Sequence, residues 1–137
     1  MASIPEKSNP GMDIASLLER ASPGQKKQFE LSSIDRLKAY GFSMDEIYRF
    51  VAPRRTLARR AARQEPLTVS ESDSLARVLN ICEMAERIFD SWQNADGWLR
   101  EPCQALNGVL PIDLLQSETG ARLVEEELHR IEHGIFF

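Results

Sequence analysis

Apolar residues recur every three or four positions along most of this 137-residue chain, a spacing that predicts α-helices. Sustained alternation of apolar and polar residues, which would indicate half-buried strands, does not occur. We expect helices over 13–21, 32–40, 43–52, 54–64 and 70–92, a short helix with turns within 94–111, and a last helix from residue 117. The hydrophobic pattern therefore predicts an all-α fold.

Capping signals define the expected helices in the N-terminal half. Ser43 and Glu46 have the Ser-x-x-Glu spacing of a capping box, and Gly41 suits the end of the preceding helix. Pro53 can close the next helix and begin another, because its fixed φ suits a first helical turn. Residues 43–64 are therefore predicted to form a helix, a tight turn and a second helix.

A long amphipathic helix is expected to follow Pro66. Ser70 and Asp73 resemble its N-terminal cap, and it continues to about residue 92. Its apolar residues lie three or four positions apart: Leu75, Val78, Leu79, Cys82, Ala85, Phe89 and Trp92. This spacing predicts that one face of the helix is buried.

The last helix has a similar pattern. Ser117 and Gly134 are placed to begin and end it. Its apolar stripe comprises Ala121, Val124, Leu128 and Ile131. Trp98 and Leu99 are expected to anchor the short preceding helix in the core.

Charge divides the chain into two unlike halves, although its formal net charge is only −4. Residues 1–65 hold 12 Lys and Arg against 8 Asp and Glu, whereas residues 66–137 hold 5 against 13. A basic half joined to an acidic half suggests two different partners.

The positive charge is concentrated in the stretch PRRTLARRAARQ, residues 53–64. On a helix, Arg55, Arg59 and Arg63 form one row, because they lie four residues apart. Leu57, Ala58 and Ala61 are expected to face the other way. Like charges at this spacing repel, and a ligand with regularly spaced anions would relieve the repulsion.

DNA fits such a helix, since its major groove admits an α-helix and arginine contacts phosphates or guanine. The candidate DNA-binding residues are Arg54, Arg55, Thr56, Arg59, Arg60 and Arg63. A solvated basic surface, paired with the acidic half, is the alternative that the residues leave open. Tight DNA binding by so short an element would need two copies, which implies a dimer or a larger assembly.

Signals for chemistry are few. The sequence contains no phosphate-binding glycine loop, nucleophile motif or metal-ligand cluster, so we predict no catalytic residue, metal or cofactor. His129 and His133 are interpreted as surface histidines, and Cys82 and Cys103 as buried thiols. The sequence lacks a membrane-spanning apolar run and a signal-peptide core, so we expect a cytoplasmic protein with no membrane partner.

The stretch GIFF, residues 134–137, can be read in two ways. Its apolar side chains either fold back onto the core or insert into a partner. Leu123 lies off the main stripe of the last helix and has a similar choice between a core contact and an interface.

Several ordered motifs resemble the Xre/MbcA/ParS antitoxins, the partners of RES-domain toxins. They are PRRTLARR (53–60), LTVSESDSLARV (67–78), AERIF (85–89), Trp98-Leu99, Pro102, ALNGVLPIDLL (105–115) and ETGARLVEEELHRIEHG (118–134). The resemblance runs from about residue 31 to the end. Cys103 stands where a small polar residue such as asparagine is expected, and residues 1–30 have no counterpart.

The resemblance implies two modules, a helix-turn-helix-like DNA-binding module (31–68) and a helical toxin-binding domain with a C-terminal plug (69–137). Residues 1–30, which lack sustained helical periodicity, are expected to form a mobile or partly helical arm. RES toxins consume or use NAD, and in this family the C-terminal end of the antitoxin blocks the NAD pocket. The implied toxin-binding residues are Leu123, His129, Glu132, His133, Gly134, Ile135, Phe136 and Phe137.

The implied function is therefore that of an antitoxin, not an enzyme, which represses its own operon. Its partners would be a RES-domain toxin, operator DNA and further copies of itself or a toxin–antitoxin hetero-oligomer. The residues leave open a stand-alone transcription regulator whose acidic domain only oligomerises, and an enzyme with an unrecognised site.

Overall fold

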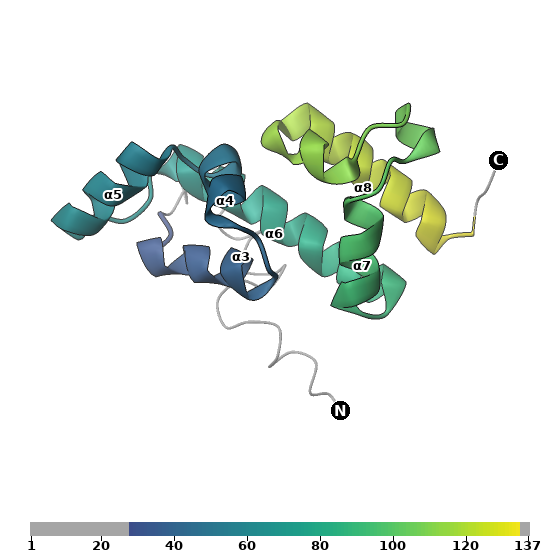
Figure 1. Cartoon of the computed structure of the whole chain (residues 1–137), viewed down its shortest axis with the longest axis horizontal. Coiled ribbons are helices and arrows are strands. Elements are labelled where there is room, and N and C mark those ends of the chain that lie inside the picture. Colours follow the sequence, from purple (N-terminus) through teal and green to yellow (C-terminus); the bar gives the residue numbers. More distant parts are fainter. Residues whose placement is uncertain (1–27, 135–137) are drawn as a thin grey trace.

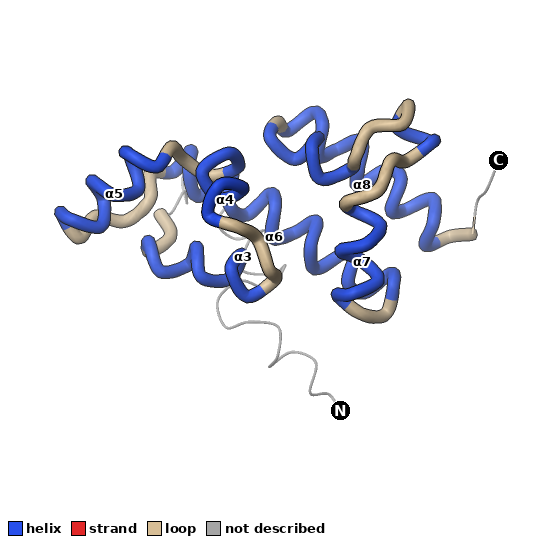
Figure 2. Tube along the Cα trace, in the orientation of Figure 1, coloured by secondary structure: helices blue, strands red, loops and turns tan. Residues whose placement is uncertain are grey.

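The computed structural model describes residues 28–134. Its helices are η1 (Leu31–Ile34), α3 (Asp35–Ala39), α4 (Met44–Phe50), α5 (Arg54–Arg63), α6 (Val69–Phe89), α7 (Trp92–Leu99), η2 (Gln104–Leu106), η3 (Pro111–Gln116) and α8 (Glu118–Glu132). Loops join them, and the described residues contain no strand, so the predicted all-α class is confirmed (Figures 1 and 2). The helix predicted over 13–21 lies outside the described residues, as do most of the predicted N-terminal arm and Ile135, Phe136 and Phe137.

The predicted capping signals around α4 are confirmed. The Ser43 side chain accepts a hydrogen bond from the Glu46 backbone N–H, and the Glu46 carboxylate accepts one from the Ser43 N–H. Gly41 follows α3 with φ of +93°, a conformation that glycine adopts at little cost. Pro53 is the N-cap of α5, so α4, the turn Val51–Pro53 and α5 form the expected helix, turn and helix.

The start and end of α6 differ from the prediction. Its N-cap is Thr68, which forms a capping box with Glu71, rather than Ser70 with Asp73. The helix ends at Phe89, because Asp90 adopts the left-handed conformation and Ser91 caps α7. The segment predicted as one helix to residue 92 is therefore one helix followed by the start of another.

Helix α6 runs through the middle of the molecule and packs against α4 on one side and α7, η3 and α8 on the other (Figure 1). Its predicted apolar stripe is buried as far as Ala85, whereas Phe89 lies half-buried. Ile81 and Met84, which lie off that stripe, are also buried. The prediction of a single buried face was too narrow, since neighbours cover α6 from several directions.

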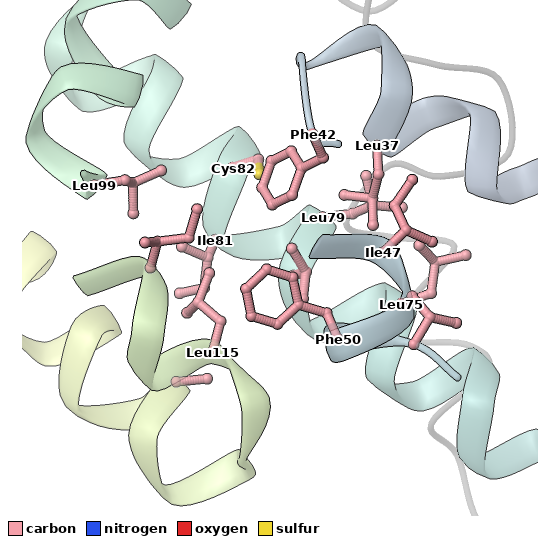
Figure 3. Close-up of a cluster of buried hydrophobic side chains, with 14 of the residues drawn as sticks. Leu37, Phe42, Ile47, Phe50, Leu75, Leu79, Ile81, Cys82, Leu99 and Leu115 are labelled. Carbon is pink, nitrogen blue, oxygen red and sulfur yellow. The ribbon is translucent and has the colours of Figure 1, made fainter. Parts of the chain in front are cut away.

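One buried cluster joins residues from both halves of the chain (Figure 3). Its labelled members come from α3, α4 and the loop before it, α6, α7 and η3: Leu37, Phe42, Ile47, Phe50, Leu75, Leu79, Ile81, Cys82, Leu99 and Leu115. Cys82 is fully buried, and burial raises the pKa of its thiol. Cys103 is only half-buried, so the expectation of two buried thiols holds for Cys82 alone.

Helix α8 packs on η3 and α6. Its predicted cap Ser117 is confirmed, and Gly134 follows the helix with φ of +70°. A Cβ added at Gly120 would lie 2.1 Å from the carbonyl oxygen of Leu114, so only glycine lets α8 approach η3 this closely. Leu99 is fully buried and Trp98 packs against Phe89, which confirms the predicted anchor of α7.

Ion pairs also connect the two halves. Arg100, at the end of α7, binds both carboxylate oxygens of Glu46 in α4, at 2.6 and 3.2 Å. Arg49 of α4 lies 3.2 Å from Asp113 of η3. These contacts and the shared core hold the helix-turn-helix segment against the C-terminal helices. The predicted boundary at residue 68 stays a prediction.

Candidate functional site: a cationic helix and the end of an acidic helix

Helix α5 presents a nearly uniform cationic surface. It contains five arginines and no acidic residue, and Leu57 is its only buried residue. Arg54, Arg55, Arg59 and Arg63 are exposed. Among the described residues, none forms an ion pair with these four arginines. The predicted row of positive charge is therefore open to solvent.

The helical wheel predicted that Ala58 and Ala61 face the core, and this prediction is wrong. Both are exposed, so α5 is anchored mainly by Leu57 and by the side of the helix that carries Arg60. The prediction failed because small apolar residues on a short surface helix satisfy helix propensity without being buried.

Arg60 occupies a different environment from the other arginines of α5. Its Nε and Nη2 donate to the two carboxylate oxygens of Glu71, at 2.8 and 2.9 Å, and Nη1 lies 3.3 Å from Glu65. Only 13 % of the Arg60 side chain is exposed. The hydrogen bond from Arg60 lowers the pKa of Glu71. Glu71 is the third residue of α6 and forms the capping box with Thr68. Arg60 therefore ties α5 to the start of α6.

The N-terminus of α5 adds hydrogen-bond donors to this surface. Pro53 provides no side-chain cap, and the first backbone N–H with an intrahelical acceptor belongs to Leu57, which donates to the Pro53 carbonyl. The N–H groups of residues 54–56, at the start of the helix, have no acceptor within it. Beside them is an open hollow of about 690 Å³ lined by Pro53, Arg54, Arg55, Thr56 and Ala58. Free N–H groups beside arginines are suited to bind an anion such as phosphate.

At the other end of the molecule, three of the predicted toxin-binding residues meet in the last turn of α8. Glu132 forms an ion pair with Arg87 of α6, and its other carboxylate oxygen lies 3.7 Å from His129 Nδ1. His133 stacks near His129, with ring centroids 6.4 Å apart. The hydrogen bond from Arg87 lowers the pKa of Glu132.

Leu123 is 45 % exposed, so of its two predicted roles the core contact is wrong and the interface stays a prediction. It lies nine residues before Glu132, about 13 Å along the helix, and on the opposite edge of the exposed face. The structure therefore groups His129, Glu132, His133 and Gly134, and leaves Leu123 as a separate exposed apolar position.

Three features of these surfaces were missed from the sequence: the partners of Arg60 and Arg100, and the role of Arg87. Arg87 and Glu132 are 45 residues apart, and Arg100 and Glu46 are 54 apart. No local spacing signals such pairs.

Within residues 28–134, no group of three or more His, Cys, Asp or Glu side chains is arranged to hold a metal ion. In the same range, none of the helices is both long and apolar enough to cross a membrane.

A basic helix-turn-helix segment packed against a compact acidic helical region defines a small all-α protein with two separate charged surfaces. Residues 84–134 match the family model of the antitoxin Xre/MbcA/ParS C-terminal toxin-binding domain. The match covers the part of the chain from the second half of α6 through α8. The resemblance predicted from the sequence is confirmed.

Curated relatives agree with this assignment. The chain is 40 % identical over 84 residues to "Antitoxin Xre" of Pseudomonas putida, a match that covers 61 % of this chain and 53 % of the relative. It is 32 % identical over 93 residues to "Prs ADP-ribosylating antitoxin" of a Sphingobium species, covering 59 % and 57 %. It is 34 % identical over 85 residues to "Antitoxin Xre" of Yersinia enterocolitica, covering 61 % and 57 %. The chain thus spans about half the length of the relatives it matches.

Proposed function

We propose that this protein is the antitoxin of a type II toxin–antitoxin pair, that it neutralises a RES-domain toxin with the end of α8 and the residues after it, and that α5 binds operator DNA. The observation that carries the proposal is the match of residues 84–134 to a toxin-binding domain. Relatives named as antitoxins support it. The protein acts by binding its partners and performs no catalysis.

Charge supports the assignment of the toxin to the α8 end. Helix α8 carries five glutamates against two arginines, and residues 66–137 carry 13 acidic against 5 basic residues. A pocket that binds NAD must accept a pyrophosphate and is therefore electropositive. An acidic surface is attracted to such a pocket and repelled by nucleic acid, so it favours the toxin over DNA.

The proposed contact with the toxin comprises the exposed end of α8 and the tail. His129, His133 and Gly134 are exposed there, and Ile135, Phe136 and Phe137 follow. In this proposal the apolar tail fills space in the toxin that otherwise accepts a nucleobase or nicotinamide. Leu123 contributes at a second point on the same helix.

Removal of residues 134–137 tests the tail directly. The truncated protein should lose neutralisation of the protein encoded by an adjacent RES-domain reading frame, measured by growth of cells that express both, and should keep its affinity for operator DNA. Its Tm should stay close to that of the full chain. Gly134, the one described residue that the truncation removes, is exposed. Full protection by the truncated protein would show that the tail is not the blocking element.

The geometry of α5 supports the DNA-binding part of the proposal. Four exposed arginines without ion-pair partners among the described residues lie beside free backbone N–H groups at the helix N-terminus. Phosphates of a DNA backbone match both kinds of donor. Arg60 is omitted from the proposed contacts because Glu71 and Glu65 bind its guanidinium. Thr56 lines the hollow at the helix N-terminus and stays within the proposed site.

The salt dependence of operator binding tests this surface. Substitution of Arg59 and Arg63 by alanine should weaken binding, and each lost phosphate contact should reduce the slope of log K against log salt by about 0.9. The control replaces Lys38 and Arg122 by alanine, because both are exposed, carry the same total charge and lie outside α5. If both double variants have the same slope, α5 is only a solvated basic surface.

Two further parts of the proposal follow from the size of α5. One ten-residue helix gives limited affinity, so we expect two copies to bind adjacent half-sites, either as a dimer or within a hetero-oligomer with the toxin. Sedimentation of the protein alone, with DNA and with toxin distinguishes these arrangements.

The two proposed partners, the toxin and operator DNA, place the protein in the cytoplasm. If no RES-domain protein binds while operator binding persists, the protein is a stand-alone regulator.

A further inference from the structure

The last turn of α8 has little support from the core. The last fully buried residue of the helix is Leu128, and Ile131 is only half-buried. An ion pair between Glu132 and Arg87, near the end of α6, also links this turn to another helix. Both partners are substantially exposed, with 32 % and 58 % of their side chains accessible. A solvent-exposed pair therefore holds the turn from which the chain continues past Gly134.

The carboxylate of Glu132 is occupied within the protein itself. One oxygen binds Arg87, and the other lies 3.7 Å from His129 Nδ1. His133, one residue further on, places its Nδ1 2.8 Å from the His129 carbonyl oxygen. A toxin cation that bound Glu132 directly would have to displace Arg87, so direct recognition by this carboxylate is disfavoured.

We infer that Arg87 and Glu132 are positioning residues, which hold the last turn of α8 against α6 in the position that the toxin recognises. The inference rests on the proposed function. It assigns a role to Arg87, which the sequence did not indicate, and it replaces the toxin contact expected of Glu132 with an internal one.

Preorganisation gives the pair its effect on affinity. A helix end without this tether frays, because terminal turns have unsatisfied carbonyls and few packing contacts. Loss of an exposed ion pair lowers the population of the ordered turn, and with it the apparent affinity for the toxin, by about two- to fivefold. Global stability changes little, because exposed ion pairs contribute weakly to it.

Hydrogen exchange of the protein alone is the first test, since it needs no toxin. The amide of His133 donates to the His129 carbonyl and that of Gly134 to the Ile131 carbonyl, so both report on the last turn. Arg87→Ala and Glu132→Gln should each accelerate their exchange, whereas the amides of Val124 and Leu128 should be unchanged. The Tm should stay within about 2 °C of the parent value.

Toxin binding at pH 8 is the second test, with the purified protein of the adjacent RES-domain reading frame as the probe. Each single variant should weaken binding about two- to fivefold, mainly through faster dissociation. The reversed pair, Arg87→Glu with Glu132→Arg, should restore both slow exchange and affinity, and Arg87→Lys should retain most of both. Lys38→Ala, which removes an exposed charge from α3, is the control for net charge.

The outcomes separate this inference from the proposed function. If the reversed pair restores slow exchange but not affinity, one of the two side chains contacts the toxin itself and the inference is wrong. Unchanged exchange in Arg87→Ala would also overturn it. If the tail truncation abolishes toxin binding while Arg87→Ala leaves it intact, only the positioning role fails. If neither change affects binding, the proposed toxin surface fails as well.

Discussion

Helices α5 and α8 lie at opposite ends of the molecule and are anchored in opposite ways (Figure 1). Helix α5 buries one residue, Leu57, and gains most of its remaining attachment from the Arg60–Glu71 ion pair. Helix α8 buries four residues and approaches η3 so closely that Gly120 is required. One helix thus exposes nearly all of its surface to a partner, whereas the other is fixed by packing and exposes mainly one acidic face.

The difference shows how a small chain can support two charged surfaces. Five arginines on one helix repel each other, and an extensively packed helix could not leave all but one of them exposed. Minimal anchoring through Leu57 and Arg60 leaves the other four arginines free. In α8, by contrast, packing fixes the helix, and only its last turn depends on an ion pair.

The largest expected effect on stability concerns the close packing of α8 on η3 at Gly120. Gly120→Ala places a methyl group 2.1 Å from a backbone oxygen, so it should lower the free energy of unfolding by about 3 kcal/mol or more. Chemical denaturation measures this change. Gly97→Ala in α7 is the matched control, because nothing lies within 4 Å of the added Cβ, and it should raise stability by up to about 1 kcal/mol. Equal effects at both glycines would contradict the tight packing of α8.

A second comparison uses one leucine from each helix. Leu57→Ala should lower the free energy of unfolding of α5 or of the whole chain by about 2–4 kcal/mol, because Leu57 is 7 % exposed. Leu123→Ala should change it by less than about 0.5 kcal/mol, because Leu123 is 45 % exposed. Leu57→Ala should weaken operator binding and Leu123→Ala toxin binding. Denaturation and the two binding assays check all four expectations.

Two arginines of the same helix give a smaller contrast. Arg60→Ala should lower the Tm, because it removes both hydrogen bonds to Glu71 and leaves that carboxylate without its main partner. Arg63→Ala should leave the Tm unchanged but weaken DNA binding. Calorimetry with parallel binding titrations separates the two roles. If Arg63→Ala lowers the Tm as much as Arg60→Ala does, the distinction between anchoring and free arginines is wrong.

The smallest effect concerns pH and the ion pair between the two halves. Hydrogen bonding from Arg100 lowers the pKa of Glu46 from its ordinary 4.5, so this stabilisation is complete above about pH 4.5 and is lost as the pH falls through the folded-state pKa. Glu46→Gln keeps the capping-box acceptor but should cost about 1 kcal/mol at pH 7 and less at pH 3. Denaturation at both pH values measures the difference. Asp45→Asn, at the exposed neighbour, should show a much smaller pH-dependent difference.

The local features of the fold were predictable from the sequence. The Ser43–Glu46 capping box, the turn at Pro53 and the stop at Gly134 each depend on residues within one helical turn, and the structure contains all three. The buried stripe of α8 follows from helical spacing in the same way.

The errors arose where a distant residue decides the structure. Ser70 with Asp73 and Thr68 with Glu71 both have the spacing of a helix start. Thr68 is the cap in the structure, where the adjacent Leu67 is fully buried and its N–H donates to the Phe29 carbonyl. Ser72, inside the helix, accepts a hydrogen bond from the Phe29 N–H. Contacts across more than 35 residues, including the pair of Arg87 and Glu132, are absent from any local pattern.

The buried thiol of Cys82 can report on transient opening of the protein core. A disulfide reagent attacks only a thiolate that it can reach, and in the native state Cys82 is fully enclosed and its raised pKa keeps the sulfur protonated. With Cys103 replaced by serine, each labelling event would record a molecule whose interior had transiently opened. The labelling rate would then give the free energy of opening without denaturant.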